Sequence, residues 1–465
     1  MNIATINAPI SLGTEKVGKL LMQYAFPAIV AMTASSLYNI TDSIFIGHGV
    51  GSYAIAGLAI TFPLMNLSTA FGTLVGTGAS TLLSVRLGQK DYETANNILG
   101  NVITLNLILG ISYTIIMLFF LDPILIFFGA SEVTLPYAHD FMVIILYGNV
   151  FTHMFFGLNA MLRSAGSPQK AMYATIYSVI INVILNPLFI FVFEWGIKGS
   201  AYATVIAQVS VLTWQLRLFS NRSMFIHFRR GAFRLRTSIV KRSIEIGMAS
   251  FLMHLASCVI VILINRGLKQ YGGDEAIGAY GIVNRVAFLF IMIVLGLNQG
   301  MQPIAGYNYG ARQYPRVIDV LKKTIFAATI VLCIGTFLVE VFPRFVASLF
   351  TSDEKLIVLA IDGLRIVFMT YPIISVQIVG SVFFQSIGMP KKAIILSTTR
   401  QVIFLMPFLL IFPHIWGIKG VWFTMPVADI IATIITFFVL LWQLRQFKKN
   451  KSDGKSDNYY RSTAW

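Results

Sequence analysis

The 465-residue chain is far more apolar than a soluble protein of similar length. Hydrophobic residues make up 56% of it, charged residues only 12%, and the mean hydropathy is +0.76. A soluble domain is about 45–50% apolar and about 25% charged. This composition indicates a polytopic membrane protein. It excludes a soluble basic domain that could use the net charge of +16 to bind nucleic acid.

Twelve apolar stretches are each long enough to cross a bilayer as a helix. They cover residues 17–46, 53–85, 95–121, 136–161, 170–193, 198–220, 241–268, 277–306, 318–343, 357–386, 391–412 and 418–445. Of the 35 lysines and arginines, 26 fall on one side of the membrane in this assignment and 6 on the other. The positive-inside rule therefore predicts that both termini are cytoplasmic. The same cations are suited to contact with anionic lipid headgroups.

The first stretch contains Asp42, a carboxylate well inside an apolar run. A charge there costs roughly 2.5–3.5 kcal/mol even on permissive insertion scales, and such residues usually face a water-filled cavity and handle ions or protons. Tyr38 is one helical turn earlier on the same face. Pro27 has no N–H to donate to the carbonyl of Gln23, so the helix can kink there. The alternative is that Asp42 is solvated near the helix end.

The fifth stretch contains Asn182 and Asn186, which are four residues apart and share a helix face. Pro187 leaves the carbonyl of Val183 without its helical partner, so we expect a second hinge there. Amide oxygens and a freed carbonyl are suited to binding a dehydrated cation, or to accepting from a protonated acid. Ordinary hydrogen bonding between helices is the alternative.

The two halves of the chain resemble each other at a constant offset of 222 residues. Matched pairs are Lys19 with Lys241, Gly78 with Gly300, Gly88 with Gly310, Pro168 with Pro390 and Lys170 with Lys392. This pattern indicates a duplication, with six spans in each half and an axis along the membrane normal. Asp42 corresponds to Ile264 and Asn182 to Phe404, so the acid-and-amide cluster belongs to the first half alone.

We therefore expect an N-lobe at residues 1–220, a basic cytoplasmic linker at 221–240, a C-lobe at 241–447 and a polar tail at 448–465. A phosphate-binding loop of the Gly-x-x-x-x-Gly-Lys type is absent, as is a His-Glu-x-x-His zinc motif. The protein is therefore not expected to be an ATP-driven pump or an enzyme. A channel is disfavoured because the polar site occurs in only one of the two duplicated halves, whereas a pore on the symmetry axis would be lined by both.

Six segments taken together carry a family resemblance over about residues 17–447. They are Tyr38–Gly47, Arg86–Gln89, Gly157–Gly166, Asn182–Pro187, Ala279–Arg285 and Gln299–Ala311. The chain resembles the multidrug and toxic compound extrusion (MATE) family, and its eighth span is most like the MepA-like group of the DinF branch. This resemblance implies an all-α, V-shaped protein of twelve transmembrane helices in two pseudo-symmetric six-helix bundles, in the bacterial inner membrane.

The resemblance also implies a cation-coupled antiporter that exports amphipathic, often cationic drugs, with no cofactor beyond H⁺ or Na⁺. Its coupling site would contain Asp42, Asn182, Asn186 and Thr204, with Tyr38, Asn159 and Pro27 beside them, and Na⁺ would bind the first four. Position 186 is often Asp in this branch. Because an amide carries no charge, Asn186 weakens a sodium site and favours protons.

The substrate cavity is expected to involve Asn39, Met65, Phe155, Phe156, Met161 and Met292, because flexible and aromatic side chains suit flat apolar cations. Packing against neighbouring side chains is the alternative for each of them.

A lipid-linked oligosaccharide flippase of the same superfamily is the alternative function, although it would need a more cationic cavity. Because one chain contains both lobes, a monomer is expected to be sufficient for transport. The remaining charges inside the spans are expected to form structural pairs. Asp362 would pair with Arg365, and Asp429 would pair with Arg400 or Arg285.

Overall fold

The computed structural model describes residues 8–229 and 231–452, which are all helix and connecting loop. The first half contains a short helix, α2 (Ala8–Thr14), and six longer helices with a small helix between two of them. The longer ones are α3 (Val17–Gly49), α4 (Ser52–Gly88), α5 (Tyr92–Phe119), α7 (Leu135–Ser164), α8 (Pro168–Pro187) and α9 (Gly196–Ser220). The small helix is α6 (Leu121–Phe127), and a π-helical segment, η1 (Leu188–Val192), extends α8.

The second half follows the same order with more interruptions. Helix α10 (Thr237–Gly310) is two helices joined across a kink at Gly273, where φ is 69°. It is followed by α11 (Tyr314–Val341), α12 (Pro343–Ser348), α13 (Glu354–Phe368), α14 (Tyr371–Ser386) and α15 (Pro390–Thr398), then by the π-helical segment η2 (Thr399–Leu405) and α16 (Met406–Ser452). Helix α16 also joins two helices across a kink, at Gly417 with φ 57°.

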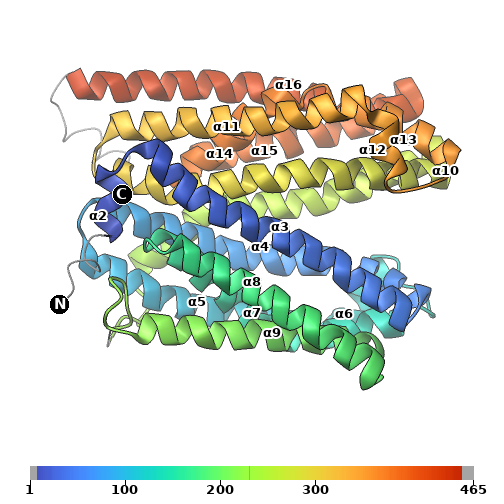
Figure 1. The fold of residues 1–465 in the computed structure, drawn as a ribbon, viewed down its shortest axis with the longest axis horizontal. Coiled ribbons are helices and arrows are strands. Elements are labelled where there is room, and N and C mark those ends of the chain that lie inside the picture. Colours follow the sequence, from blue (N-terminus) through green and yellow to red (C-terminus); the bar gives the residue numbers. More distant parts are fainter. Residues whose placement is uncertain (1–7, 230, 453–465) are drawn as a thin grey trace.

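The number of long apolar helices in the described residues comes close to the twelve membrane crossings expected. In the described part of the chain, nine helices are long and apolar enough to span a bilayer, and the bent pair α13 and α14 makes a tenth. The stretch Pro390–Lys449 is 60 residues long and kinks at Gly417. At 1.5 Å per residue it is about 90 Å long, enough for two crossings of a core of about 30 Å. The less apolar α9 returns alongside α8 (Figure 1).

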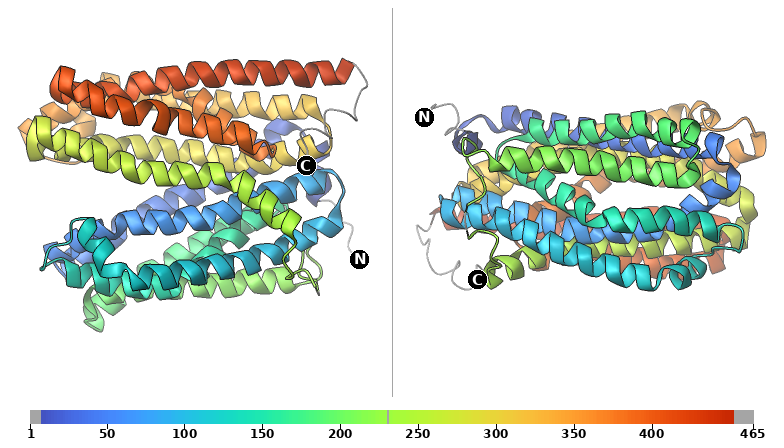
Figure 2. Two further views of the ribbon diagram at one scale, coloured as in Figure 1. Left: turned by 180° about the vertical axis from the view of Figure 1, so that it is seen from behind. Right: turned by 90° about the horizontal axis from the view of Figure 1, so that it is seen from below.

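The helices of the two halves form two groups that lie side by side (Figure 1). The groups come together toward the end that carries the chain termini and diverge toward the opposite end, which gives the V shape (Figure 2). The helices α3 and α4 of the first half pack against α10 of the second. The larger apolar core extends across this junction, and a smaller one fills the first half near α4, α6 and α7.

The junction follows the duplication. Gln302 of α10 donates to Thr81 of α4 at 2.7 Å and to Ser80 at 3.2 Å, and Ser80 is the residue that the 222-residue offset pairs with Gln302. A methyl group at Gly88 would lie 2.0 Å from the carbonyl oxygen of Tyr307, and one at Gly310 would lie 2.1 Å from that of Val85. Only glycine permits backbones to approach so closely.

The segment between α9 and α10 is basic, as expected, and it packs back on the first half. The side chain of Asn101 on α5 donates to the carbonyl oxygens of Ala232 and Arg234 at 3.0 and 3.1 Å. At the other end of the chain, α16 continues through Ser452. The rest of the expected tail, residues 453–465, lies outside the described residues. The division into lobes at 220 and 241 stays a prediction.

Candidate functional site

Asp42 lies in the second half of α3, and its side chain faces α8 and α9. Its exposed fraction is 8%. The carboxylate oxygen Oδ1 accepts a hydrogen bond from the amide Nδ2 of Asn186 on α8 and another, at 2.5 Å, from the hydroxyl of Ser200 on α9. Three helices therefore meet at one carboxylate, and both donors stabilise its charged form.

A second set of hydrogen bonds lies beside the first. The phenol of Tyr38 and the hydroxyl of Thr204 are 2.8 Å apart, and the amide of Asn182 donates to the same hydroxyl at 3.1 Å. Tyr38 is four residues before Asp42, Asn182 four before Asn186, and Ser200 four before Thr204. We call these six residues the Asp42 cluster: Tyr38, Asp42, Asn182, Asn186, Ser200 and Thr204.

Helical spacing explains why the cluster forms. Residues four apart lie one above the other on a helix, so each of α3, α8 and α9 presents two polar groups on one face. Asn182 and Asn186 are 3% and 0% exposed. Helix α8 ends at Pro187, directly after Asn186, and the chain continues as the π-helical segment η1. A backbone irregularity therefore lies next to the cluster, as the proline predicted.

The charge on Asp42 has no cationic partner among residues 8–229 and 231–452. Among the described residues, no lysine, arginine or histidine forms an ion pair with it, whereas the other deeply buried acid, Asp429, pairs with Arg400 at 2.5 Å. The amide oxygen of Asn186 is also buried and has no hydrogen-bond partner within the described part of the chain. The cluster thus contains an uncompensated negative charge next to an unused acceptor, which suits a proton or a small cation.

Two expected members of the site lie apart from these contacts. Asn159 on α7 donates to the carbonyl oxygen of Ala171 and to the hydroxyl of Thr175 at 3.1 and 3.2 Å, and accepts from Arg163 at 2.5 Å. These bonds join α7 to α8 near their connection, so the structure does not bring Asn159 into the Asp42 cluster. Pro27 lies inside α3 without interrupting it.

The residues expected to line a substrate cavity are mostly packed against other side chains. Met161 is fully buried in the larger core, and Phe155 is 5% exposed in a small apolar cluster that Phe156 packs against. In this conformation neighbouring helices bury the apolar surface of Met161 and Phe155, and their role in a substrate cavity stays a prediction. Met65 packs beside the first-half core, and Met292 is half-buried. The side chain of Asn39 lies outside what the structure describes.

Other charged and histidine side chains that the sequence singles out form contacts between helices. Arg400 and Asp429 bridge η2 and α16, as expected. Arg365 lies 4.0 Å from Glu340 of α11, so the expected pairing with Asp362 is wrong for the described residues. His153 lies between helices, with its Nε2 3.2 Å from the hydroxyl of Ser68, which also donates to Asn149.

Sequence reasoning missed Ser200. Serine is common in membrane helices and carries little signal alone. Its position, one turn before Thr204 on the same helix face, could have identified it. Gln208 lies one turn after Thr204 on the same face of α9, and its side-chain oxygen accepts a hydrogen bond from the hydroxyl of Thr152 on α7. Polar residues thus follow one face of α9 for three successive turns.

The fold and the Asp42 cluster define a polytopic helical transporter built by duplication, with a polar site in one half only. The chain belongs to the MatE family, whose model matches residues 27–188 and 246–411. It is 27% identical over 422 residues to the multidrug export protein MepA of Staphylococcus haemolyticus, covering 91% of this chain and 93% of that protein.

Solved structures agree with this assignment. One, described as the outward-facing conformation of a multidrug resistance MATE family transporter of the MOP superfamily, has a TM-score of 0.89 and 25% identity, covering 94% of this chain and 98% of that one. Another, of MATE in the bent conformation, has the same score and identity, covering 96% and 99%. MATE family members are transporters rather than enzymes, so the protein is a multi-pass membrane transporter of the multidrug efflux type.

Proposed function

We propose that the protein is a proton-coupled antiporter that exports amphipathic, often cationic compounds across the bacterial inner membrane by alternating access. Asp42 is the coupling carboxylate, and both termini are cytoplasmic. The single observation that carries the proposal is that Asp42 is buried between three helices and that no described cation pairs with it. An unpaired buried charge is costly, so binding a counter-charge there changes which conformation is favoured.

A proton would reorganise the hydrogen bonds of the cluster. With Asp42 charged, Asn186 and Ser200 both donate to it. Once the carboxyl is protonated it becomes a donor, and the nearby acceptor is the amide oxygen of Asn186, which has no partner among the described groups. Rotation of that amide would then satisfy both residues. Position 186 can therefore respond to the protonation of Asp42 without carrying charge itself.

Sodium is the alternative coupling ion. Its ligands would be oxygens of Asp42, Asn182, Asn186 and Thr204, but the hydroxyl of Thr204 is engaged by Tyr38 and the amide nitrogen of Asn182. A single carboxylate would supply the only negative charge. Binding a proton requires fewer groups to move than binding sodium, and this difference supports proton coupling.

Alternating access would use the junction between the halves. In this conformation α4 and α10 are in backbone contact near Gly88 and Gly310, which are the last residues of the two helices. The opposite conformation requires that contact to open. Pro27 and Pro187 are the proposed hinges, because each lacks the N–H that holds a helix straight. Pro187 is followed directly by the π-helical segment η1.

The names of relatives and the charge of Asp42 support the proposed substrate class. MepA of Staphylococcus haemolyticus is named as a multidrug export protein. A cationic substrate could replace the proton as the counter-charge of Asp42, so substrate and proton would compete for one site. Such competition is sufficient for exchange, and the protein needs no partner subunit for it.

The test is efflux of a fluorescent cation such as ethidium from proteoliposomes, with a proton gradient or a sodium gradient imposed separately. Wild type is expected to export the dye on the proton gradient alone, and Asp42→Asn to lose at least tenfold in rate while still reconstituting. Asp362→Asn is the matched control, because Asp362 is an exposed acid on α13. Export on the sodium gradient alone would refute proton coupling. If neither gradient moves the dye, the exporter function itself fails and a flippase becomes the better hypothesis.

A further inference from the structure

A half-buried lysine lies at the mouth of an apolar groove on the outer surface of the second half. The groove has a volume of about 410 Å³ and is lined by Lys392, Ile395 and Leu396 of α15 and by Phe438, Val439 and Trp442 of α16. Three of its apolar side chains are largely exposed, Phe438 by 64%, Ile395 by 58% and Trp442 by 48%. In a chain that spans the membrane, this surface faces lipid.

Lys392 is held in place by aromatic and amide groups. Its ammonium lies 4.4 Å from the ring centroid of Trp442 and 5.4 Å from that of Phe384, and it donates to the side-chain oxygen of Gln443. The two rings stabilise a cation without neutralising it. Among the described residues, no carboxylate forms an ion pair with Lys392. Within the described part of the chain, its ammonium is therefore without a counter-charge.

The surroundings of Lys392 are also positive. Lys391 precedes it, and Arg445, one turn beyond Trp442 on α16, is exposed. Neither α15 nor α16 beyond Asp429 contains an acid within its described residues. The groove thus has cations at one end, close to where α15 begins, and an apolar lining formed by Ile395, Leu396, Phe438 and Val439. Tryptophan and lysine are the residues that mark the level of lipid headgroups.

We propose that this groove is a binding site for one anionic phospholipid, such as phosphatidylglycerol. The phosphate pairs with Lys392, and an acyl chain lies along Ile395 and Phe438. Snorkelling of a lysine to a headgroup while its stem covers apolar surface is the expected geometry at this depth. Neither the coupling site nor the drug-export proposal is needed for this inference.

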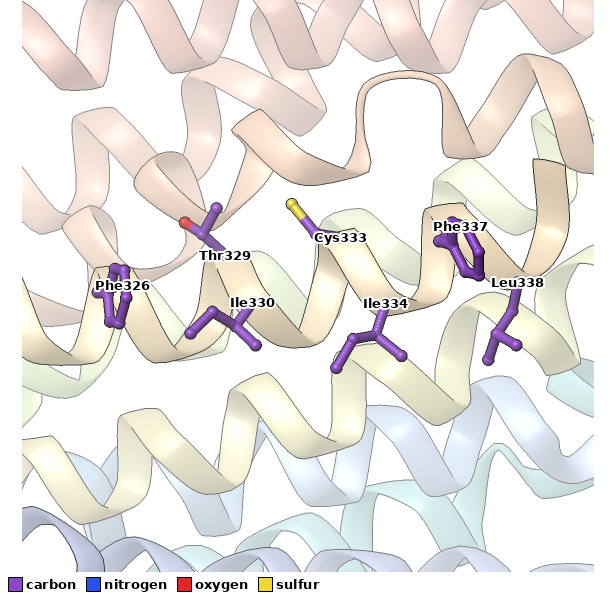
Figure 3. A pocket seen from close by; sticks show the side chains of 7 residues that line it. All are labelled: Phe326, Thr329, Ile330, Cys333, Ile334, Phe337 and Leu338. Carbon is purple, nitrogen blue, oxygen red and sulfur yellow. The ribbon is translucent and has the colours of Figure 1, made fainter. Parts of the chain in front are cut away.

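Two other sites on the protein sharpen the proposal. The groove on α11 lined by Phe326, Thr329, Ile330, Cys333, Ile334, Phe337 and Leu338 has a similar volume, about 360 Å³, but contains no charged side chain (Figure 3). It can hold an acyl chain without selecting a headgroup. Lys170, the equivalent of Lys392 in the first half, lies 3.3 Å from the sulfur of Met224.

The experiment measures quenching of Trp442 by brominated lipids in purified full-length protein. The Trp442 signal is the difference between wild type and Trp442→Phe. Dibrominated phosphatidylglycerol is expected to quench it at a mole fraction about fivefold lower than dibrominated phosphatidylcholine, because each cation near an anionic surface adds about 1 kcal/mol. Lys392→Gln should abolish this preference, while Lys392→Arg and Lys170→Gln keep it.

Equal quenching by the two lipids in wild type would overturn the proposal and show ordinary annular lipid. A preference that survives Lys392→Gln would also overturn it. Loss of the preference in Lys170→Gln as well would assign it to the overall positive charge of this end of the protein, which refutes a local site. Monodisperse elution of each variant in size-exclusion chromatography shows that it is folded.

Discussion

Gly88 and Gly310 hold equivalent places in the two halves, and each faces the helix of the other half. Gly88 of α4 faces the carbonyl of Tyr307, which is three residues before Gly310. Gly310 of α10 faces the carbonyl of Val85, which is three residues before Gly88. One duplicated contact is therefore used twice across a pseudo-two-fold axis. A side chain at either position would separate α4 from α10 at this end of the junction.

We predict that Gly88→Ala shifts the protein away from the conformation described here. A methyl group there would lie 2.0 Å from a carbonyl oxygen, so backbone must move. Overpacking of this kind costs about 1–3 kcal/mol, which changes a two-state ratio by about 5- to 150-fold. Efflux should fall, because the closed junction is needed once in every cycle. Gly281→Ala is the matched control, since a methyl group there meets nothing within 4 Å.

The shift can be measured as a distance. Spin labels on cysteines at Lys90 and Arg312, which follow α4 and α10 by two residues, report the separation of the two helix ends after Cys258 and Cys333 are replaced. Gly88→Ala should lengthen or broaden the distance distribution, and Gly281→Ala should leave it as in wild type. An unchanged distribution in Gly88→Ala would show that this contact does not control the junction.

A second prediction concerns Ser200, which donates to Asp42 at 2.5 Å. Ser200→Ala removes one of two donors that favour the charged carboxylate, and a hydrogen bond to a charged group contributes about 1.5–3 kcal/mol. The protonated form of Asp42 is then relatively favoured. The pH at which ethidium efflux is half-maximal should therefore move upward, by about one unit or more. Ser210→Ala, on the exposed side of the same helix, should leave the profile unchanged.

A third prediction concerns the amide at position 186. Asn186→Asp would place a second carboxylate within hydrogen-bonding reach of Asp42. Two such groups do not both ionise readily without a cation between them. We expect the variant to gain stimulation of efflux by an imposed sodium gradient, which wild type lacks. Asn182→Asp is the comparison, because Asn182 contacts Thr204 rather than Asp42. If sodium has no effect on Asn186→Asp, the native amide does not determine ion choice.

The polar cluster was largely predictable because its signals are local. Asp42, Tyr38, Asn182 and Asn186 stand out as polar groups at helical spacing in apolar runs, and the structure brings them together with Thr204. The V-shaped arrangement of two groups of helices, expected from the resemblance, is also present. The duplication was readable because glycine, proline and lysine do not recur at one offset by chance.

What the sequence could not supply was the direction of each side chain. Asn159 has the right residue type and family position, yet its amide reaches Ala171 and Thr175. Arg365 and Asp362 have suitable spacing, but Arg365 faces a different helix and approaches Glu340. Met161 could equally line a cavity or fill a core, and only packing of neighbouring helices decides that. These outcomes depend on helix rotation, which composition and periodicity leave open.

A final prediction concerns the buried ion pair between Arg400 of η2 and Asp429 of α16. Their side chains are 26% and 3% exposed, and Nε of Arg400 lies 2.5 Å from Oδ1 of Asp429. Asp429→Leu leaves a largely buried guanidinium without its partner, which costs about 3–5 kcal/mol. The midpoint of thermal unfolding, followed by size-exclusion chromatography after heating, should fall clearly. The double variant Arg400→Met, Asp429→Leu removes both charges and should recover most of that loss.

The control for this prediction is the pair of Arg365 and Glu340, whose side chains are 55% and 39% exposed and 4.0 Å apart. Exposed pairs contribute about 0–1 kcal/mol, so Glu340→Gln should barely move the midpoint. A second comparison separates stability from coupling. If the pair is structural, the double variant should retain the proton dependence of efflux found in wild type. If the double variant is stable but no longer responds to the proton gradient, Asp429 belongs to the coupling machinery and Asp42 is not its only acid.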